Sequence, residues 1–125
     1  MATTACPSAV GMEQPHLQGV WHAQLTPVPG QPGHSDSHAV LHLHPHPELS
    51  GSVRGTVQRG GGTAQVTGDV HLGELTLEES TDGVHISATW LGDVVEGSCG
   101  KEIHGIWTTP TPEITTPFVL RKQAP

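Results

Sequence analysis

Three histidines alternate with other residues at His42, His44 and His46. On a β-strand they would share one face, with neighbouring Cα atoms about 6.6 Å apart, close enough for two imidazoles to bind one zinc or copper ion. His42 and His46 would lie about 13 Å apart in an extended chain, so a site of all three needs a bend at Pro45 or a ligand from another strand. The pattern predicts either a zinc or copper site or a solvated histidine face without a metal.

Three tryptophans are the other residues whose type is typical of a binding site. Trp21 and Trp107 each occur in a Gly-x-Trp sequence, and Trp90 ends a segment of alternating apolar residues. Aromatic side chains are frequent in ligand pockets, and here three of four aromatic residues are tryptophan. Trp90 and Trp107 are therefore candidate contacts for a small ligand. The alternative is that the tryptophans fill a core that is otherwise poor in large residues.

No pattern typical of a catalytic site occurs in the sequence. The metalloprotease motif HExxH, the nucleophile motif GxSxG and the Walker loop are all absent. Cys99 would need a neighbouring base to act as a nucleophile, and its place in a Gly-Ser-Cys-Gly turn favours a structural role. We therefore expect a protein without enzymatic activity and without catalytic residues.

Cys6 and Cys99 are the two cysteines of the chain, and both lie in irregular segments. An even number of cysteines in such segments permits a disulfide, which would indicate an oxidising compartment; two free thiols are the alternative. The first fifteen residues lack the basic and apolar regions of a secretory signal peptide. We expect a periplasmic or secreted protein that begins after its cleavage site, in preference to a cytoplasmic one.

Charge and composition disfavour two classes of partner. The chain carries twelve acidic and five basic residues, for a formal net charge of −7, and the few scattered Lys and Arg do not suit a nucleic-acid backbone. No apolar run approaches the roughly 18 residues that a membrane-spanning helix requires. Asn and Tyr are absent, a bias that indicates a bacterium with a GC-rich genome.

The elements that must position these residues are β-strands. Gly and Pro are so frequent that the longest segment without them, at 34–44, has eleven residues, and that segment alternates apolar and polar side chains. Eight or nine segments alternate in this way, at 19–26, 39–44, 53–58, 64–70, 75–77, 84–90, 94–99, 103–107 and 118–121. Turns are expected at Asp82-Gly83, Gly92-Asp93 and Gly100-Lys101.

Tight turns between consecutive strands make neighbouring strands antiparallel. The sequence therefore predicts a single all-β domain at 19–125, an antiparallel up-and-down β-barrel of about eight strands, because closure removes exposed edges. A two-sheet β-sandwich is the alternative. Residues 1–18 are expected to form an irregular N-terminal arm.

The first and last predicted strands carry a family resemblance. Gly19-Val20-Trp21, together with the basic Arg121 of the last strand, resembles the calycin barrels, which include lipocalins, fatty-acid-binding proteins and avidins. The resemblance covers a few residues and implies that Trp21 packs against Arg121 at the barrel floor. It also implies that Trp90 and Trp107 line a cavity, as avidin tryptophans do. The polar loop with which avidins hold biotin is replaced here, so biotin binding is not expected.

These observations favour a bacterial, exported, non-enzymatic β-barrel that binds a small ligand inside the barrel or at its mouth. One alternative is a zinc- or copper-binding protein that uses the histidine-rich strand. A second alternative is a protein–protein interaction or inhibitor module, which would have a filled core without a cavity.

Overall fold

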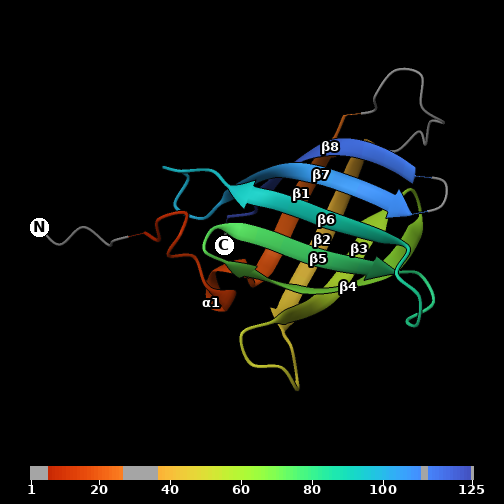
Figure 1. Ribbon diagram of the computed structural model, residues 1–125, viewed down its shortest axis with the longest axis horizontal. Coiled ribbons are helices and arrows are strands. Elements are labelled where there is room, and N and C mark those ends of the chain that lie inside the picture. Colours follow the sequence, from red (N-terminus) through yellow and green to blue (C-terminus); the bar gives the residue numbers. More distant parts are fainter. Residues whose placement is uncertain (1–5, 27–36, 111–112, 125) are drawn as a thin grey trace, which may run out of the picture.

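Antiparallel strands form a closed barrel in which β8 returns to pair with β1 (Figure 1). The structure is a computed structural model, and it describes residues 6–26, 37–110 and 113–124. Within these residues the strands are β1 (Gly19–Leu25), β2 (His38–Pro45), β3 (Val53–Arg59), β4 (Gly62–His71), β5 (Glu74–Ser80), β6 (Ala88–Val94), β7 (Glu102–Pro110) and β8 (Glu113–Lys122). The predicted all-β, up-and-down barrel of eight strands is confirmed.

Alternate residues of each strand point into the barrel, as the sequence pattern predicts. On β5, for example, Leu75 and Leu77 are buried, whereas Thr76 between them is exposed. The largest fully buried side chains are Trp21, Trp90, Phe118, Met12, Leu17, Leu25, Leu41, Leu43, Leu75, Leu77, Ile103 and Leu120. The interior of the barrel is therefore filled with side chains over most of its length.

Gly92 lies inside β6, where the sequence predicts a turn, and that prediction is wrong. Gly92 pairs with Leu75 on one side and with Gly105 of β7 on the other. A Cβ atom added at Gly105 would overlap the carbonyl oxygen of Leu91, so only glycine allows the two strands to approach this closely. Glycines in strands are typical of such close approaches and of the sharp bends that close a small barrel.

The first half of the strand predicted at 84–90 is a loop, and so is nearly all of the strand predicted at 94–99. The carboxylate of Asp82 accepts hydrogen bonds from the backbone N–H groups of Val84 and His85, which gives this backbone an alternative to strand pairing. Val84 is consequently 80% exposed, and β6 begins only at Ala88. Residues 95–101 connect β6 to β7 without forming a strand. The strand predicted at 94–99 is therefore not present among the described residues, and eight of the nine predicted strands remain.

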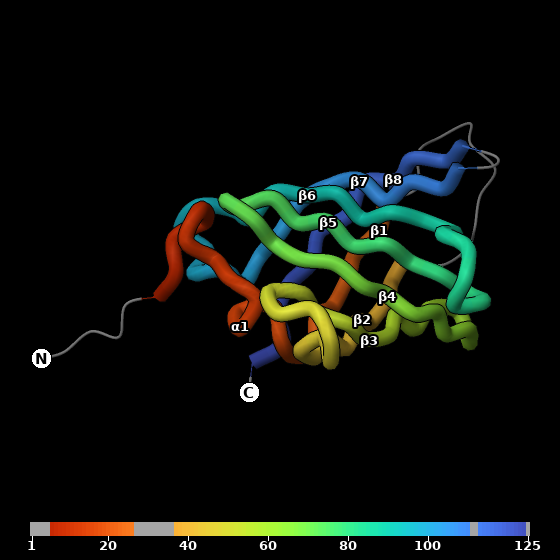
Figure 2. Tube along the Cα trace, turned by 60° about the horizontal axis from the view of Figure 1, so that its bottom comes forward, coloured from red at the N-terminus to blue at the C-terminus, as the bar shows by residue number. Residues whose placement is uncertain are grey.

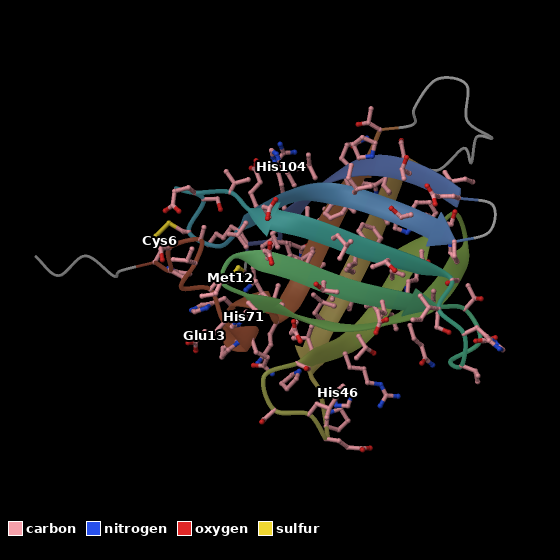
Figure 3. The ribbon with its side chains drawn as sticks, in the orientation of Figure 1. Cys6, Met12, Glu13, His46, His71 and His104 are labelled. Atoms are coloured by element: carbon pink, nitrogen blue, oxygen red, sulfur yellow. A yellow bond between two sulfur atoms is a disulfide. The ribbon has the colours of Figure 1, made fainter. Side chains whose placement is uncertain are left out.

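The N-terminal segment closes one end of the barrel, which we call the floor. The one-turn helix α1 (Gln14–Leu17) interrupts the predicted irregular arm, and Met12 and Leu17 are buried as part of the barrel core. A disulfide joins Cys6 to Cys99 and so ties this segment to the β6–β7 connection (Figure 3). Such bonds persist in oxidising compartments.

The opposite end of the barrel, which we call the mouth, carries the turn between β3 and β4 and the loop at 81–87. Figure 2 shows α1 at the left end of the molecule and the 81–87 loop at the right end. Among the described residues, no helix has the length and apolar character needed to cross a membrane.

Candidate ligand site at the barrel mouth

Glu79 of β5 is a carboxylate inside the apolar core, with a side chain only 1% exposed. Its Oε1 accepts hydrogen bonds from the indole N–H groups of Trp90, at 2.9 Å, and Trp107, at 3.3 Å. Its Oε2 accepts a hydrogen bond of 2.9 Å from Nη2 of Arg59. Burying a carboxylate is costly unless it is paired, and here three donors compensate it.

The strand register brings these four side chains together. Trp90 and Trp107 are direct partners across β6 and β7, and both point inward. On β5, Leu77 is the partner of Trp90. Glu79 lies two positions after Leu77, so its side chain points to the inner face of the barrel as that of Leu77 does. Arg59 ends β3 at the mouth. The site is thus built from the mouth ends of four strands.

Arg59 is the member of the group nearest to solvent. Its guanidinium lies over the Trp107 ring, with Cζ 4.8 Å from the ring centroid, and its side chain is 22% exposed. Its Nη1 atom is buried and has no hydrogen-bond partner among the described residues. A buried donor without an acceptor costs about 1–3 kcal/mol.

A cavity of about 130 Å³ lies beside Arg59. Its lining consists of Val57, Arg59, Gly62, Thr63, Ala64 and Thr81. Val57 and Ala64 are inward-facing apolar residues, whereas Thr63 and Thr81 are exposed. The lining of the cavity therefore includes apolar residues, two threonines and an arginine.

The arrangement suits binding better than acid–base chemistry. Both oxygens of Glu79 already accept hydrogen bonds from side chains of the barrel. A general base must reach the proton that it removes, and a carboxylate that is this enclosed and fully engaged does not. Glu79 therefore acts here as an anchor that holds Arg59 and the two indoles in place.

Glu79 and Arg59 were not among the site residues predicted from the sequence. A signal for Glu79 was present, since it shares its parity along the strand with Leu75 and Leu77. Arg59 likewise continues the inward series that includes Val57. A charged residue at an inward position of a predicted strand is the pattern that would have found both.

The structure places the two predicted ligand contacts beneath this site. Trp90 is fully buried and packs against Phe118, with ring centroids 5.0 Å apart. Trp107 is 4% exposed and is covered by Arg59. Neither tryptophan lines the cavity beside Arg59. Direct contact of Trp90 or Trp107 with a ligand stays a prediction.

At the floor, Lys122 takes the position that the resemblance assigns to Arg121. Lys122 is the partner of Trp21 in the β1–β8 register, and its Nζ lies 5.9 Å from the Trp21 ring centroid. Arg121 is one position along, points outward and bonds to Glu102 with an Nε–Oε1 distance of 3.3 Å. The expected packing of Trp21 against Arg121 is therefore not formed, because strand alternation turns Arg121 away from the core.

The three predicted metal ligands lie on or beyond β2. His42 and His44 point outward from the strand, whereas His46 lies past its end and accepts hydrogen bonds at Nδ1 from the backbone N–H groups of Glu48 and Leu49. Figure 3 shows His46 well apart from His71 and His104. In the part of the chain that the structure describes, no three His, Cys, Asp or Glu side chains are grouped to hold a metal ion. Zinc or copper binding by His42 and His44 stays a prediction.

Comparison with known proteins finds no protein-family model that matches the chain and no curated protein similar to it. The closed eight-stranded antiparallel barrel is compatible with a calycin-like fold.

Proposed function

We propose that this protein is a non-enzymatic, calycin-like barrel that binds a small ligand at its mouth, beside Arg59. The observation that carries the proposal is the buried Nη1 atom of Arg59, which lacks a partner among the described residues and belongs to a side chain lining a cavity of about 130 Å³. Native proteins rarely leave such donors unpaired, and a bound acceptor is one explanation. The filled lower barrel supports the mouth, rather than the interior, as the place of binding.

The charges of the site favour an uncharged ligand. Glu79 already neutralises Arg59 through a 2.9 Å ion pair, and the whole chain has a formal net charge of −7, so an anion gains little here. A carbonyl or hydroxyl oxygen would supply the missing acceptor without adding charge. The cavity has the volume of about four water molecules in the liquid, which suits a small carbonyl compound or the polar end of a longer one.

Propionamide and propionate are matched probes for this proposal, because they have nearly the same shape and differ in charge. We expect propionamide to shift the NMR signals of the Arg59 guanidinium and the Trp107 indole in a saturable way, and to do so at lower concentration than propionate. Thr81→Phe, which fills the rim of the cavity from an exposed position, should abolish the response. Thr76→Phe, on the outer face of β5, which ends one residue before Thr81, is the control.

Three results of this titration would count against the proposal. An absence of saturable shifts with both probes would remove the ligand site at the mouth. A response that survives Thr81→Phe would place binding elsewhere, and a preference for propionate would overturn the choice of an uncharged ligand. The thermal unfolding of both variants, measured beforehand, verifies that each is folded.

A protein–protein interaction module is the second candidate function. That hypothesis predicts a filled core, and the packed interior below the mouth agrees with it. Exposed Leu91 and Ile106, partners across β6 and β7, line an outer groove of about 330 Å³ that would suit such a role. Failure of every mouth probe would favour this alternative.

Export from a bacterial cell is part of the same proposal. The disulfide between Cys6 and Cys99 supports an oxidising environment, such as the periplasm or the outside of the cell. Trapping free thiols in freshly lysed cells of the source organism tests this point, because a cytoplasmic protein would keep both cysteines reduced.

A further inference from the structure

His22 and His38 lie next to each other on the outer wall of the barrel. In the β1–β2 register His22 faces Val40 and Gln24 faces His38, so the two histidines are diagonal neighbours on one face. Their ring centroids are 5.6 Å apart, and the ring planes are inclined by 33°. His38 is exposed and His22 is half-buried, so an ion from solution can reach the pair.

The separation of the two rings is close to that of two imidazoles bound to one metal ion. Zinc lies at about 2.0–2.1 Å from each imidazole nitrogen, which places the centroids of two such rings about 5 Å apart. A small rotation of the side chains would bring the observed 5.6 Å to this value. Because both strands belong to a closed barrel, their backbones hold the pair in place without further adjustment.

Gln123 orients the His22 ring in the way that metal-binding histidines require. Nε2 of His22 lies 2.7 Å from Oε1 of Gln123, and an amide oxygen only accepts hydrogen bonds. The proton of the neutral ring therefore resides on Nε2, and Nδ1 carries the lone pair that a metal ion needs. A hydrogen bond from the other ring nitrogen to an oxygen is typical of metal-ligating histidines.

The charges near the pair tolerate a cation. Arg121 faces His22 from β8, but its Nε bonds to Glu102 of β7, on the side of β8 away from β1. The chain as a whole has a formal net charge of −7, which favours the approach of a cation.

We propose that His22 and His38 form a two-imidazole site for a divalent transition-metal ion, with water in the remaining positions. We expect copper(II) to bind more tightly than zinc, because nitrogen ligands have their highest affinity for copper(II) among the divalent first-row transition metals. The site lies on the outer wall, uses neither His42 nor His44, and does not depend on ligand binding at the mouth.

Copper(II) titration of the full chain without an affinity tag, followed by electron paramagnetic resonance, tests the site. We expect one tight equivalent with hyperfine coupling to two imidazole nitrogens. His22→Gln and His38→Gln should each weaken this equivalent by about tenfold or more, a ratio that competition with a chelator measures. His71→Gln, at an exposed histidine that ends β4, is the matched control and should leave the affinity unchanged.

Two outcomes would overturn the proposal. The first is an affinity for copper(II) that stays the same in His22→Gln and His38→Gln. The second is a loss of affinity in His42→Gln/His44→Gln without a loss in His22→Gln, which would assign metal binding to the predicted ligands on β2. Circular dichroism of each metal-free variant separates loss of the site from loss of the fold.

Discussion

Each end of the barrel has a tryptophan covered by a basic side chain. The two ends differ in whether the polar groups of this pair all have hydrogen-bond partners. At the floor, Trp21 donates its indole N–H to the carbonyl oxygen of Leu17 at 2.9 Å, and Lys122 donates to the carbonyl oxygen of His16 at 2.8 Å. These partners are neutral backbone groups, and buried Met12 and Leu17 seal the end. The floor is therefore a closed structural cap.

At the mouth, the equivalent pair of Arg59 over Trp107 rests on a buried carboxylate. Glu79 accepts from both Arg59 and Trp107, yet one Arg59 nitrogen remains without a partner among the described residues, and a cavity lies beside it. A buried ion pair contributes little net stability compared with apolar packing. The difference supports the proposed binding role of the mouth, whereas the floor is a closed structural cap.

Replacement of Glu79 by leucine should have the largest effect and tests the mouth directly. It leaves Arg59 as an uncompensated charge and two indole N–H groups without an acceptor, so we expect a loss of about 3–5 kcal/mol in the free energy of unfolding. Urea denaturation measures this loss. Glu78→Leu, at an exposed position next to it, should change stability by less than about 0.5 kcal/mol.

The double variant Arg59→Met/Glu79→Leu tests whether the instability of Glu79→Leu comes from the unpaired charge of Arg59. Since no charge is left unpaired, it should be clearly more stable than Glu79→Leu alone. The same variant should lose the response to propionamide. A double variant as unstable as the single one would show that the mouth charges serve stability, and the contrast between the two ends would then fail.

Removal of the disulfide should have the next largest effect, and it acts at the floor. Cys6 and Cys99 are separated by 93 positions, and the bond restricts a long loop of the unfolded chain, so Cys6→Ser/Cys99→Ser should lose about 2–4 kcal/mol. Thermal unfolding without reductant measures the loss. The propionamide response at the mouth should persist; its disappearance would mean that the two ends are coupled.

The apolar alternation of the sequence was sufficient to predict the barrel. Parity along a strand decides which residues are buried, and it is a local property that the sequence displays directly. Parity also put Glu79 inside, but its partners come from three other strands. Their relative register depends on long-range pairing, which a single sequence does not display, so the mouth site was not predictable as a site.

Parity distinguishes Arg121 from Lys122, because Lys122 follows the buried Phe118 and Leu120 at alternate positions of β8 and Arg121 does not. The two residues are adjacent, and a shift of one position moves a side chain from the outer face to the core. The loop at 81–87 is a case in which parity predicts the wrong structure. Val84 and Ile86 continue the alternation that is typical of a strand. However, the carboxylate of Asp82 accepts hydrogen bonds from the backbone N–H groups of Val84 and His85, which are then not available for strand pairing.

Substitution of Lys122 should have a moderate effect and tests which basic residue completes the floor. Lys122→Met removes the cation over Trp21 and the hydrogen bond to His16, for an expected loss of about 1–2 kcal/mol. Arg121→Met should cost less than about 0.5 kcal/mol, because Arg121 forms an exposed ion pair. Chemical denaturation of the two variants side by side gives the comparison, and a larger effect at Arg121 would contradict the observed register.

Acidification should have the smallest effect, and it acts on the loop at the rim of the mouth. Hydrogen bonds from the His85 side chain and from the backbone N–H groups of His85 and Val84 hold the pKa of Asp82 well below its usual value. A carboxyl pKa that is lowered by folding stabilises the folded loop fully above the ordinary pKa of 3.8, and this stabilisation is lost as the pH falls below that value. Amide hydrogen exchange of Val84 and His85 should therefore rise relative to the β5 amides between about pH 4 and pH 2. Asp82→Ala should show the faster relative exchange at every pH, and a pH dependence that survives in this variant would assign the effect to another group.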